Sequence, residues 1–232
     1  MTFPRWIVLT ALLLSPTLAR CEAFHVHSLF VKTDRATCSA RLAHTLEKTE
    51  KFLKVETDAD GQVHGVGESA SLVGFFFPQR EGEGMIVVLA AVHADIHEAG
   101  KLVLRVKDAL EKEGDGSELK LAKAEEPEKS DRKSTAWPLR WSIENRPSNK
   151  TTRLLVPASQ IVMEKQGLNT NSVGNSPMAF GGDQNRVAAM LAVPDANDDK
   201  INILVLSASP RIEEAERLHR ALKQELVKVL FE

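Results

Sequence analysis

A stretch of 42 residues that occurs twice constrains this chain more than any other feature of its sequence. Leu72–Glu113 aligns without a gap on residues 188–229 when 116 is added to each number, and eight positions are identical. Each copy has the pattern of an apolar strand, a short turn, a second apolar strand and an amphipathic helix. The repeat predicts two modules of the same architecture. The alternative, two unrelated hairpin–helix units with similar patterning, stays open from the sequence alone.

The first copy of the repeat shows how each unit is expected to fold. Leu72–Phe77 and Met85–Val92 are apolar almost throughout, which is typical of strands that are buried on both faces. Asp95 is a candidate N-cap for the helix that follows, and Glu98 three residues later would complete a capping box. Apolar residues recur every three or four positions in this helix, so the helix is expected to pack on the strands.

The segments that precede each copy have different patterns. Phe24–Lys32 alternates like a strand, which would place His25, His27, Leu29 and Val31 on one face. A helix at Arg35–Leu53, capped by Thr33 or Asp34, and a hairpin formed by Lys54–Thr57 and Gln62–Val66 are expected to follow. In the second half, the expected elements are strands at Trp137–Asn145 and Thr152–Val156 and a short helix at Ala158–Gln166.

The segment Leu168–Gly182 is rich in Asn, Ser and Gly and predicts a long loop. Loops of this length inside a domain are uncommon and are usually functional or disordered. The segment is therefore a candidate binding surface.

Antiparallel strand pairs that helices cover on one face indicate an α+β architecture. We expect two tandem modules, each an antiparallel sheet with a C-terminal amphipathic helix packed on it, related by internal duplication. The first module would span residues 24–113 and the second residues 136–232. Residues 114–135 mix both charges with Gly, Ser and Pro, which is typical of a flexible linker. The two sheets are expected either to merge side by side or to be hinged by this linker.

The N-terminus has the pattern of a secretory signal peptide. Arg5 gives a short positive region, Trp6–Leu14 is an apolar run, and small residues suited to cleavage follow at Ala19 or Ala23. The run is far shorter than the roughly 20 apolar residues of a transmembrane helix. We expect residues 1–23 to be removed and the mature chain to be exported, to the periplasm or the extracellular space, without a transmembrane segment.

Composition argues against a nucleic-acid partner. Thirty basic and thirty-two acidic residues give a formal net charge of -2, so the whole protein has no strong field to attract polyanions. Tyr is absent, which removes most aromatic platforms for base stacking. Cys21 remains beside Cys38 only if cleavage follows Ala19, and the position of Cys38 on an apolar helix face predicts a buried thiol.

Catalytic motifs are absent from the sequence. It contains no Walker loop, no H-E-x-x-H metal helix, no C-x-x-C pair and no G-x-S-x-G nucleophile elbow. A non-catalytic role is therefore favoured over an enzyme.

Histidines are concentrated in the first half, which holds six of the seven. His25 and His27 share a strand face, and His93 and His97 flank Asp95 at a strand-to-helix junction. Neutral imidazoles and a carboxylate are suitable ligands for Zn²⁺ or Cu²⁺. These five residues are the candidate metal ligands, and a metal is the one cofactor that the sequence suggests. Solvent-exposed or hydrogen-bonded histidines are the alternative interpretation.

Two functions follow from these observations. The first is an exported, non-catalytic protein that binds a protein, an envelope component or a small ligand through a sheet face or through Leu168–Gly182. The second is a metal-binding protein or a metal-dependent hydrolase that uses the histidines of the first module.

Overall fold

The computed structural model describes residues 24–79, 84–112, 134–172, 177–195 and 200–231. The predicted signal peptide and residues 114–133 of the predicted linker lie outside these ranges, so both remain predictions. Within the described ranges, no helix combines the length and the apolar character that crossing a membrane requires.

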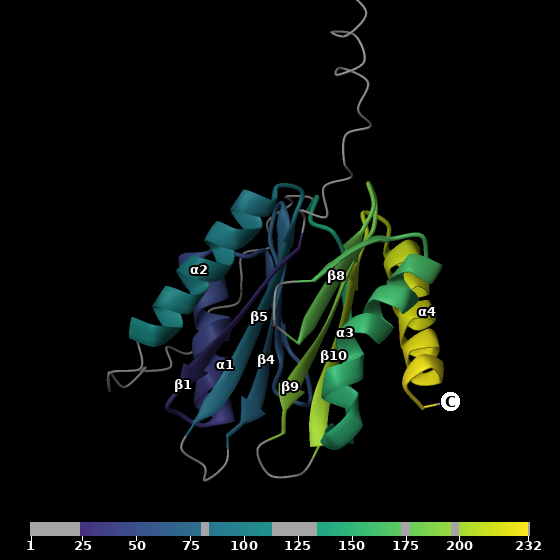
Figure 1. The fold of residues 1–232 in the computed structure, drawn as a ribbon. Coiled ribbons are helices and arrows are strands. Elements are labelled where there is room, and N and C mark those ends of the chain that lie inside the picture. The colour runs from purple at the N-terminus through teal and green to yellow at the C-terminus, as the bar shows by residue number, and fades with distance from the viewer. Residues whose placement is uncertain (1–23, 80–83, 113–133, 173–176, 196–199, 232) are drawn as a thin grey trace, which may run out of the picture.

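The molecule has four layers, in which two sheets lie face to face and helices cover their outer sides (Figure 1). The first module contains, in chain order, β1 (Phe24–Val31), α1 (Arg35–His44), the π-helical turn η1 (Thr45–Thr49), β2 (Lys54–Thr57), β3 (Val63–Val66), β4 (Ala70–Pro78), β5 (Met85–His93) and α2 (Ile96–Lys112). Its strands form one antiparallel sheet in the order β1-β5-β4-β3-β2.

The second module repeats this sequence of elements. It contains β6 (Leu139–Pro147), α3 (Ser148–Lys165), β7 (Asn169–Ser172), β8 (Met178–Gly182), β9 (Val187–Pro194), β10 (Lys200–Ala208) and α4 (Ile212–Phe231). Its antiparallel sheet has the order β6-β10-β9-β8-β7, which matches the first sheet strand for strand. The prediction of two tandem α+β modules, each with a C-terminal helix on its sheet, is confirmed.

Strand register repeats with the same offset as the sequence. Pro78 of β4 pairs with Met85 of β5, and adding 116 to both numbers gives Pro194 and Ile201, which pair in the second sheet. The β3–β4 and β8–β9 ladders follow the same offset, since Val63 opposite Gly74 corresponds to Ala179 opposite Met190. Similar hairpins that arose independently would not need to share a register, so this agreement favours duplication.

The first strand of each module corresponds with an offset of 115. Phe24 lies opposite Val92, and Leu139 lies opposite Ala208, which is 116 beyond Val92. Both first residues are buried in the core between the sheets. Positions in β1 can therefore be matched to positions in β6 by adding 115.

Gly65 and Gly181 occupy equivalent positions where a helical segment lies against the sheet. A Cβ at Gly65 would lie 2.9 Å from Leu46 Cδ1 of η1, and one at Gly181 would lie 2.6 Å from Met163 Sδ of α3. Neither space can hold a methyl group without movement, so both modules use glycine for the same close approach.

Three features of the second module differ from the prediction. Thr152–Val156 is not a strand, because it belongs to α3, an 18-residue helix that begins well before Ala158. Leu155, Val162 and Met163 of this helix are buried against the outer face of the second sheet. The segment Leu168–Gly182 is not simply a loop, because it contains the paired strands β7 and β8. The helix of the second module is therefore at least as long as its counterpart in the first.

Neither of the two expected arrangements, a merged sheet or two modules hinged by the linker, is observed. The strands form two separate sheets, and a single apolar cluster joins their inner faces, with Phe75 and Val88 from the first and Leu191 and Leu204 from the second. The strands β4, β5, β9 and β10 are buried on both faces because helices cover one side and the other sheet covers the other.

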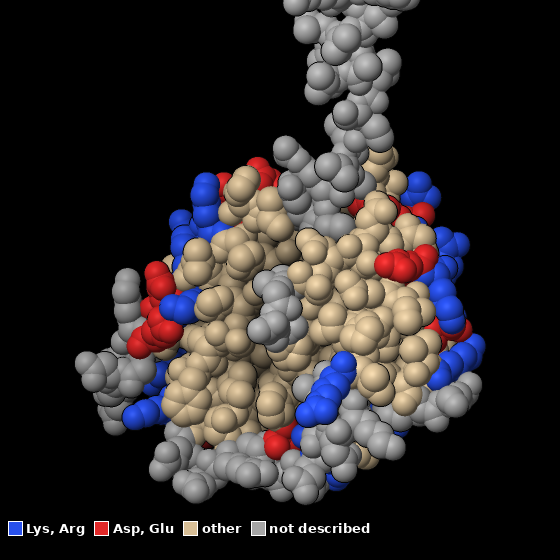
Figure 2. Space-filling model, viewed as in Figure 1, with Lys and Arg blue, Asp and Glu red and all other residues tan. Residues whose placement is uncertain are grey.

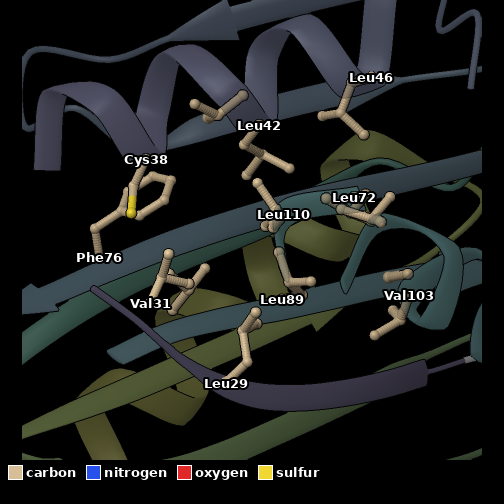
Figure 3. Packing of buried hydrophobic residues seen from close by; sticks show 14 of the residues in the cluster. Leu29, Val31, Cys38, Leu42, Leu46, Leu72, Phe76, Leu89, Val103 and Leu110 are labelled. Atoms are coloured by element: carbon tan, nitrogen blue, oxygen red, sulfur yellow. The ribbon is translucent and has the colours of Figure 1, made fainter. Parts of the chain in front are cut away.

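The outer core of the first module shows how its helices are held (Figure 3). Four leucine and valine side chains converge on the outer face of the sheet and are fully or almost fully buried: Leu42 from α1, Leu46 from η1, and Val103 and Leu110 from α2. Cys38 joins this cluster as a buried thiol, as predicted, and burial raises its pKa to about 11. The thiol is therefore kept protonated and unreactive.

Candidate functional site

A groove opens between the two sheets along one edge of the sandwich. It has a volume of about 290 Å³, and its walls come from β1 and β5 on one side and from β8, β9 and the residue before β8 on the other. The apolar residues in its lining include Val26, Ile86, Val88, Met178, Leu191 and Val193. Val26, Ile86 and Met178 are only partly buried although they pack on the inter-sheet core. The groove itself shows that the core is open at this edge.

The alternation of β1 determines which of its side chains reach the groove. Leu29 and Val31 belong to the outer core under the helices, whereas Phe24 and Val26 belong to the core between the sheets. Because successive side chains of a strand point to opposite faces, Ser28 lies on the groove side with Val26.

The opposite edge of the sandwich is filled by aromatic side chains. The indole of Trp141 in β6 lies edge-on to the imidazole of His64 in β3, with 4.9 Å between the ring centroids, and 6.3 Å from the ring of Phe75 in β4. Burial lowers the pKa of His64 to about 4, with smaller effects from Glu56 and Arg140. The imidazole is therefore neutral at pH 7 and packs as an apolar ring.

Equivalent positions at the two edges differ in size and polarity. Five residues at the filled edge are larger than their counterparts in the groove: Trp141 against Val26, Ile143 against Ser28, Leu204 against Val88, Phe75 against Leu191, and Phe77 against Val193. Two further positions carry polar side chains at the filled edge, Gln62 and Asn202, and apolar ones in the groove, Met178 and Ile86. The groove therefore has smaller side chains than the filled edge at five equivalent positions, and apolar side chains in place of polar ones at two others.

Charge is absent from the lining of the groove. Among the described residues that line it there is no Lys, Arg, Asp or Glu. The most polar are Ser28 and His27, and strand alternation points the His27 side chain to the helix side. The face onto which it opens, where β1 and β8 lie toward the viewer in Figure 1, shows mostly uncharged residues at its centre and charged ones toward the helices (Figure 2). A neutral, apolar ligand is the kind that such a lining accepts.

A second cleft of about 340 Å³ lies in the first module, between the end of η1, the β3–β4 turn and the start of α2. Its lining is ionic, and the guanidinium of Arg105 donates to both carboxylate oxygens of Glu50, at 2.9 Å from Nε and 2.7 Å from Nη2. The side chain of Glu50 is only 9% exposed, so its charge is already neutralised within the protein. We therefore place the candidate site in the groove between the sheets.

The predicted metal ligands His93, Asp95 and His97 lie at the β5–α2 junction, where they form hydrogen bonds within the chain. The Asp95 backbone N–H donates to His93 Nδ1 at 2.8 Å, so Nδ1 carries no proton and Nε2 donates to Ser69 Oγ at 3.1 Å. Asp95 Oδ1 accepts from the backbone N–H of His97 at 2.8 Å, which confirms Asp95 as a helix cap. The second half of the predicted capping box is wrong, because the Asp95 N–H is bound to His93 and is not available to Glu98.

The other two predicted ligands, His25 and His27, lie on β1. A Cβ at Gly100 of α2 would lie 3.4 Å from His25 Nδ1, which places this imidazole on the helix side of the sheet, with Leu29 and Val31 as predicted. Burial lowers the pKa of His25, and the neighbouring His27 lowers it further. Across the described ranges, no three His, Cys, Asp or Glu side chains gather as a metal-binding group. The metal site stays a prediction.

Sequence reasoning missed most of the groove. It did single out Leu168–Gly182 as a binding surface, and Pro177 and Met178 of that segment line the groove. The smaller residues of β9 could have been found by comparing Leu191 and Val193 with Phe75 and Phe77 inside the aligned repeat. Val26 could not, because its match to Trp141 depends on the register of β1 and β6.

Comparison with known proteins identifies no relative. No protein-family model matches the sequence, and no curated protein matches it. Among solved structures, the di-domain ARO/CYC StfQ from the steffimycin biosynthetic pathway aligns over 89% of this chain and 96% of its own, with 8% identity and a TM-score of 0.25. The immunity protein TplEi of the type VI secretion system of Pseudomonas aeruginosa, complexed with an "L" peptide, aligns over 88% and 91%, with 10% identity and a TM-score of 0.22. Scores this low carry no argument about function.

Proposed function

We propose that the mature chain is an exported, non-catalytic binding protein whose inter-sheet groove holds an apolar group of its ligand. One observation carries the proposal. Five groove positions each hold a smaller residue than the equivalent position at the filled edge, and two others exchange polar for apolar side chains. A gap left by imperfect packing would not be expected to replace polar side chains by apolar ones at the same positions.

The dimensions of the groove limit what can bind. Its volume of about 290 Å³ lies at the lower end of ligand pockets, which typically enclose about 300–1,000 Å³. The groove therefore suits a few apolar side chains or one short alkyl or aromatic group. Burying such a group releases water from Ile86 and Met178, which are now only partly covered, and this release favours binding.

Filling the groove tests the proposal directly. Val26→Trp, alone and with Ser28→Ile, introduces the residue types found at the equivalent positions Trp141 and Ile143. The neutral fluorescent probe N-phenyl-naphthylamine is titrated into the purified protein, and its emission rises when it enters an apolar site. We expect V26W to weaken binding by roughly tenfold, which is about 1.4 kcal/mol, and the double variant to weaken it further.

The matched control is Leu104→Trp, which adds the same indole to α2 on the outside of the molecule, where Leu104 is 48% exposed. This variant is expected to bind the probe as the unaltered protein does. Near-ultraviolet circular dichroism and urea midpoints establish that each variant is folded. Equal probe affinity for V26W, L104W and the unaltered protein would show that the groove is not the binding site.

Export is tested independently of binding. We infer that residues 1–23 direct the chain out of the cytoplasm and that the groove functions in the periplasm or outside the cell. N-terminal sequencing of the protein from its native host should find a mature chain that begins after Ala19 or Ala23. A chain that keeps Met1 and stays in the cytoplasm contradicts this part of the proposal.

A further inference from the structure

The four edge strands of the two sheets are unequally protected against pairing with another strand. The edges are β1 and β2 in the first sheet and β6 and β7 in the second. The strands β2 and β7 have only four residues each, and β6 carries Arg140, Glu144 and Arg146 and ends at Pro147. Short length, charge and proline are the devices by which proteins block edge pairing. The strand β1 has eight residues and contains no charge and no proline.

The outer edge of β1 lies next to the groove. The strand pairs with β5 along its whole length, and no strand in the described ranges pairs with its other edge. Val26 and Ser28 of β1 line the groove, and Phe30, two residues further along the same face, is 48% exposed. Within the described ranges, an unpaired backbone edge and an apolar groove are therefore side by side, on the face whose centre is mostly uncharged in Figure 2.

We propose that β1 and the groove together bind an extended segment of a partner protein, which adds to the first sheet as a sixth strand. This inference rests on the proposed function and names its ligand. The backbone of the segment would pair with β1, and every second side chain would point toward the inter-sheet groove, because side chains alternate along a strand. The other side chains would lie on the helix side, beside His25 and His27. The segment is therefore neutral on its groove side, apolar at alternate positions, and free of proline where it pairs.

A separate strand fits this edge better than a second copy of the chain does. The strand β1 contacts β9, the groove reaches β8, and β7 lies beyond β8 in the second sheet. The second sheet thus extends past β1, and an added strand would lie opposite β8 and β7. Pairing of β1 with β1 of another copy would bring the projecting β7 edges of both molecules into the same space.

Peptide selection identifies the sequence pattern that the edge accepts. Random octapeptides displayed on phage are selected on the purified exported protein, in parallel on V26W and on L104W. We expect the selected peptides to be apolar at every second position and to lack proline in their centre. They should bind the unaltered protein and L104W alike, and V26W at least roughly tenfold more weakly.

Backbone methylation then tests strand addition without changing the protein. One selected peptide is made in two forms, N-methylated at alternate residues, at the even positions in one form and the odd positions in the other. In an added strand, the N–H groups of every second residue point toward β1, and those of the other residues point away from it. The form that is methylated at the first set should therefore lose roughly tenfold or more in affinity, while the other form binds normally. Amide hydrogen exchange should slow in Phe24–Val31 when the unmethylated peptide binds.

The outcomes separate this inference from the proposed function. If V26W blocks the naphthylamine probe but the peptides show no alternation, or both methylated forms bind equally, strand addition is wrong and the groove still binds an apolar group. If V26W changes neither probe nor peptide binding, both proposals fail. If sedimentation shows a dimer whose β1 amides are already protected from exchange, the occupant is a second copy and the partner-strand inference is wrong.

Discussion

Replacing His64 by phenylalanine should remove a large part of the acid sensitivity of this fold. The imidazole is held against Trp141 between the sheets, its Nε2 has no hydrogen-bond partner among the described residues, and burial lowers its pKa to about 4. The equivalent residue of the second module is Phe180, so a phenyl ring suits this kind of position. H64F keeps an aromatic ring beside Trp141 and removes the group that takes up a proton.

The sign and size of the effect follow from the two pKa values. In the unfolded chain a histidine binds a proton near pH 6.5, whereas folded His64 binds one only near pH 4. The unfolded state therefore holds more protons between these values, and the free energy of unfolding falls as the pH is lowered from about 6.5 to about 4. At 1.36 kcal/mol per pKa unit, and with allowance for partial solvent access, His64 accounts for roughly 2–3 kcal/mol of this loss. Below pH 4 its contribution levels off.

Urea denaturation followed by tryptophan fluorescence at a series of pH values between 7 and 4 measures this loss. H64F should be more stable than the unaltered protein by about 1 kcal/mol at pH 7, because a buried unpaired nitrogen is removed, and by a larger margin at pH 4.5. His219, whose pKa burial also lowers to about 4, is the internal comparison. H219V introduces the residue type of the equivalent Val103, and it should remove a similar part of the stability that the protein loses between pH 7 and pH 4. If the stability of H64F declined as steeply as that of the unaltered protein, the burial argument would be refuted.

Two further predictions concern the first and second modules. Gly181→Ala should destabilise the protein by about 1–3 kcal/mol in urea denaturation, because its Cβ would lie 2.6 Å from Met163 Sδ and 3.1 Å from Met163 Cβ. Gly100→Ala, inside α2, should instead stabilise by about 0.5–1 kcal/mol, because the nearest atom to its Cβ, His25 Nδ1 of β1, lies at 3.4 Å. Equal effects of the two substitutions would contradict the packing argument. If the first-module histidines bind a metal, mass-spectrometric metal analysis should find stoichiometric Zn²⁺ or Cu²⁺ in the purified protein and none in His93→Ala combined with His97→Ala. Equal metal content in both proteins would exclude these two residues as ligands.

The helix α3 shows how tertiary packing can override a local pattern. Pro157 disfavours a helical conformation at Val156 and removes a hydrogen bond from a helix interior, at a cost of about 3 kcal/mol. These preferences predict a break, and the β-branched residues before it predict a strand. The helix nevertheless continues, because Leu155, Val162 and Met163 must cover the outer face of the second sheet. The strands that these residues cover lie outside α3 in the sequence, so a local sequence pattern does not reveal this packing.

Periodicity and the repeat were enough to determine the units from which this protein is built. They predicted the buried hairpins, the C-terminal helices, the face shared by His25 and Leu29, and the buried thiol of Cys38, because each depends on neighbours a few residues apart. The stacking of the two sheets and the groove depend on which surfaces meet. The pattern of apolar residues predicts which side chains are buried, but it does not predict which other part of the chain covers them. Val26 and Trp141 have the same place in their modules, and only the tertiary structure shows that one leaves a groove where the other fills it.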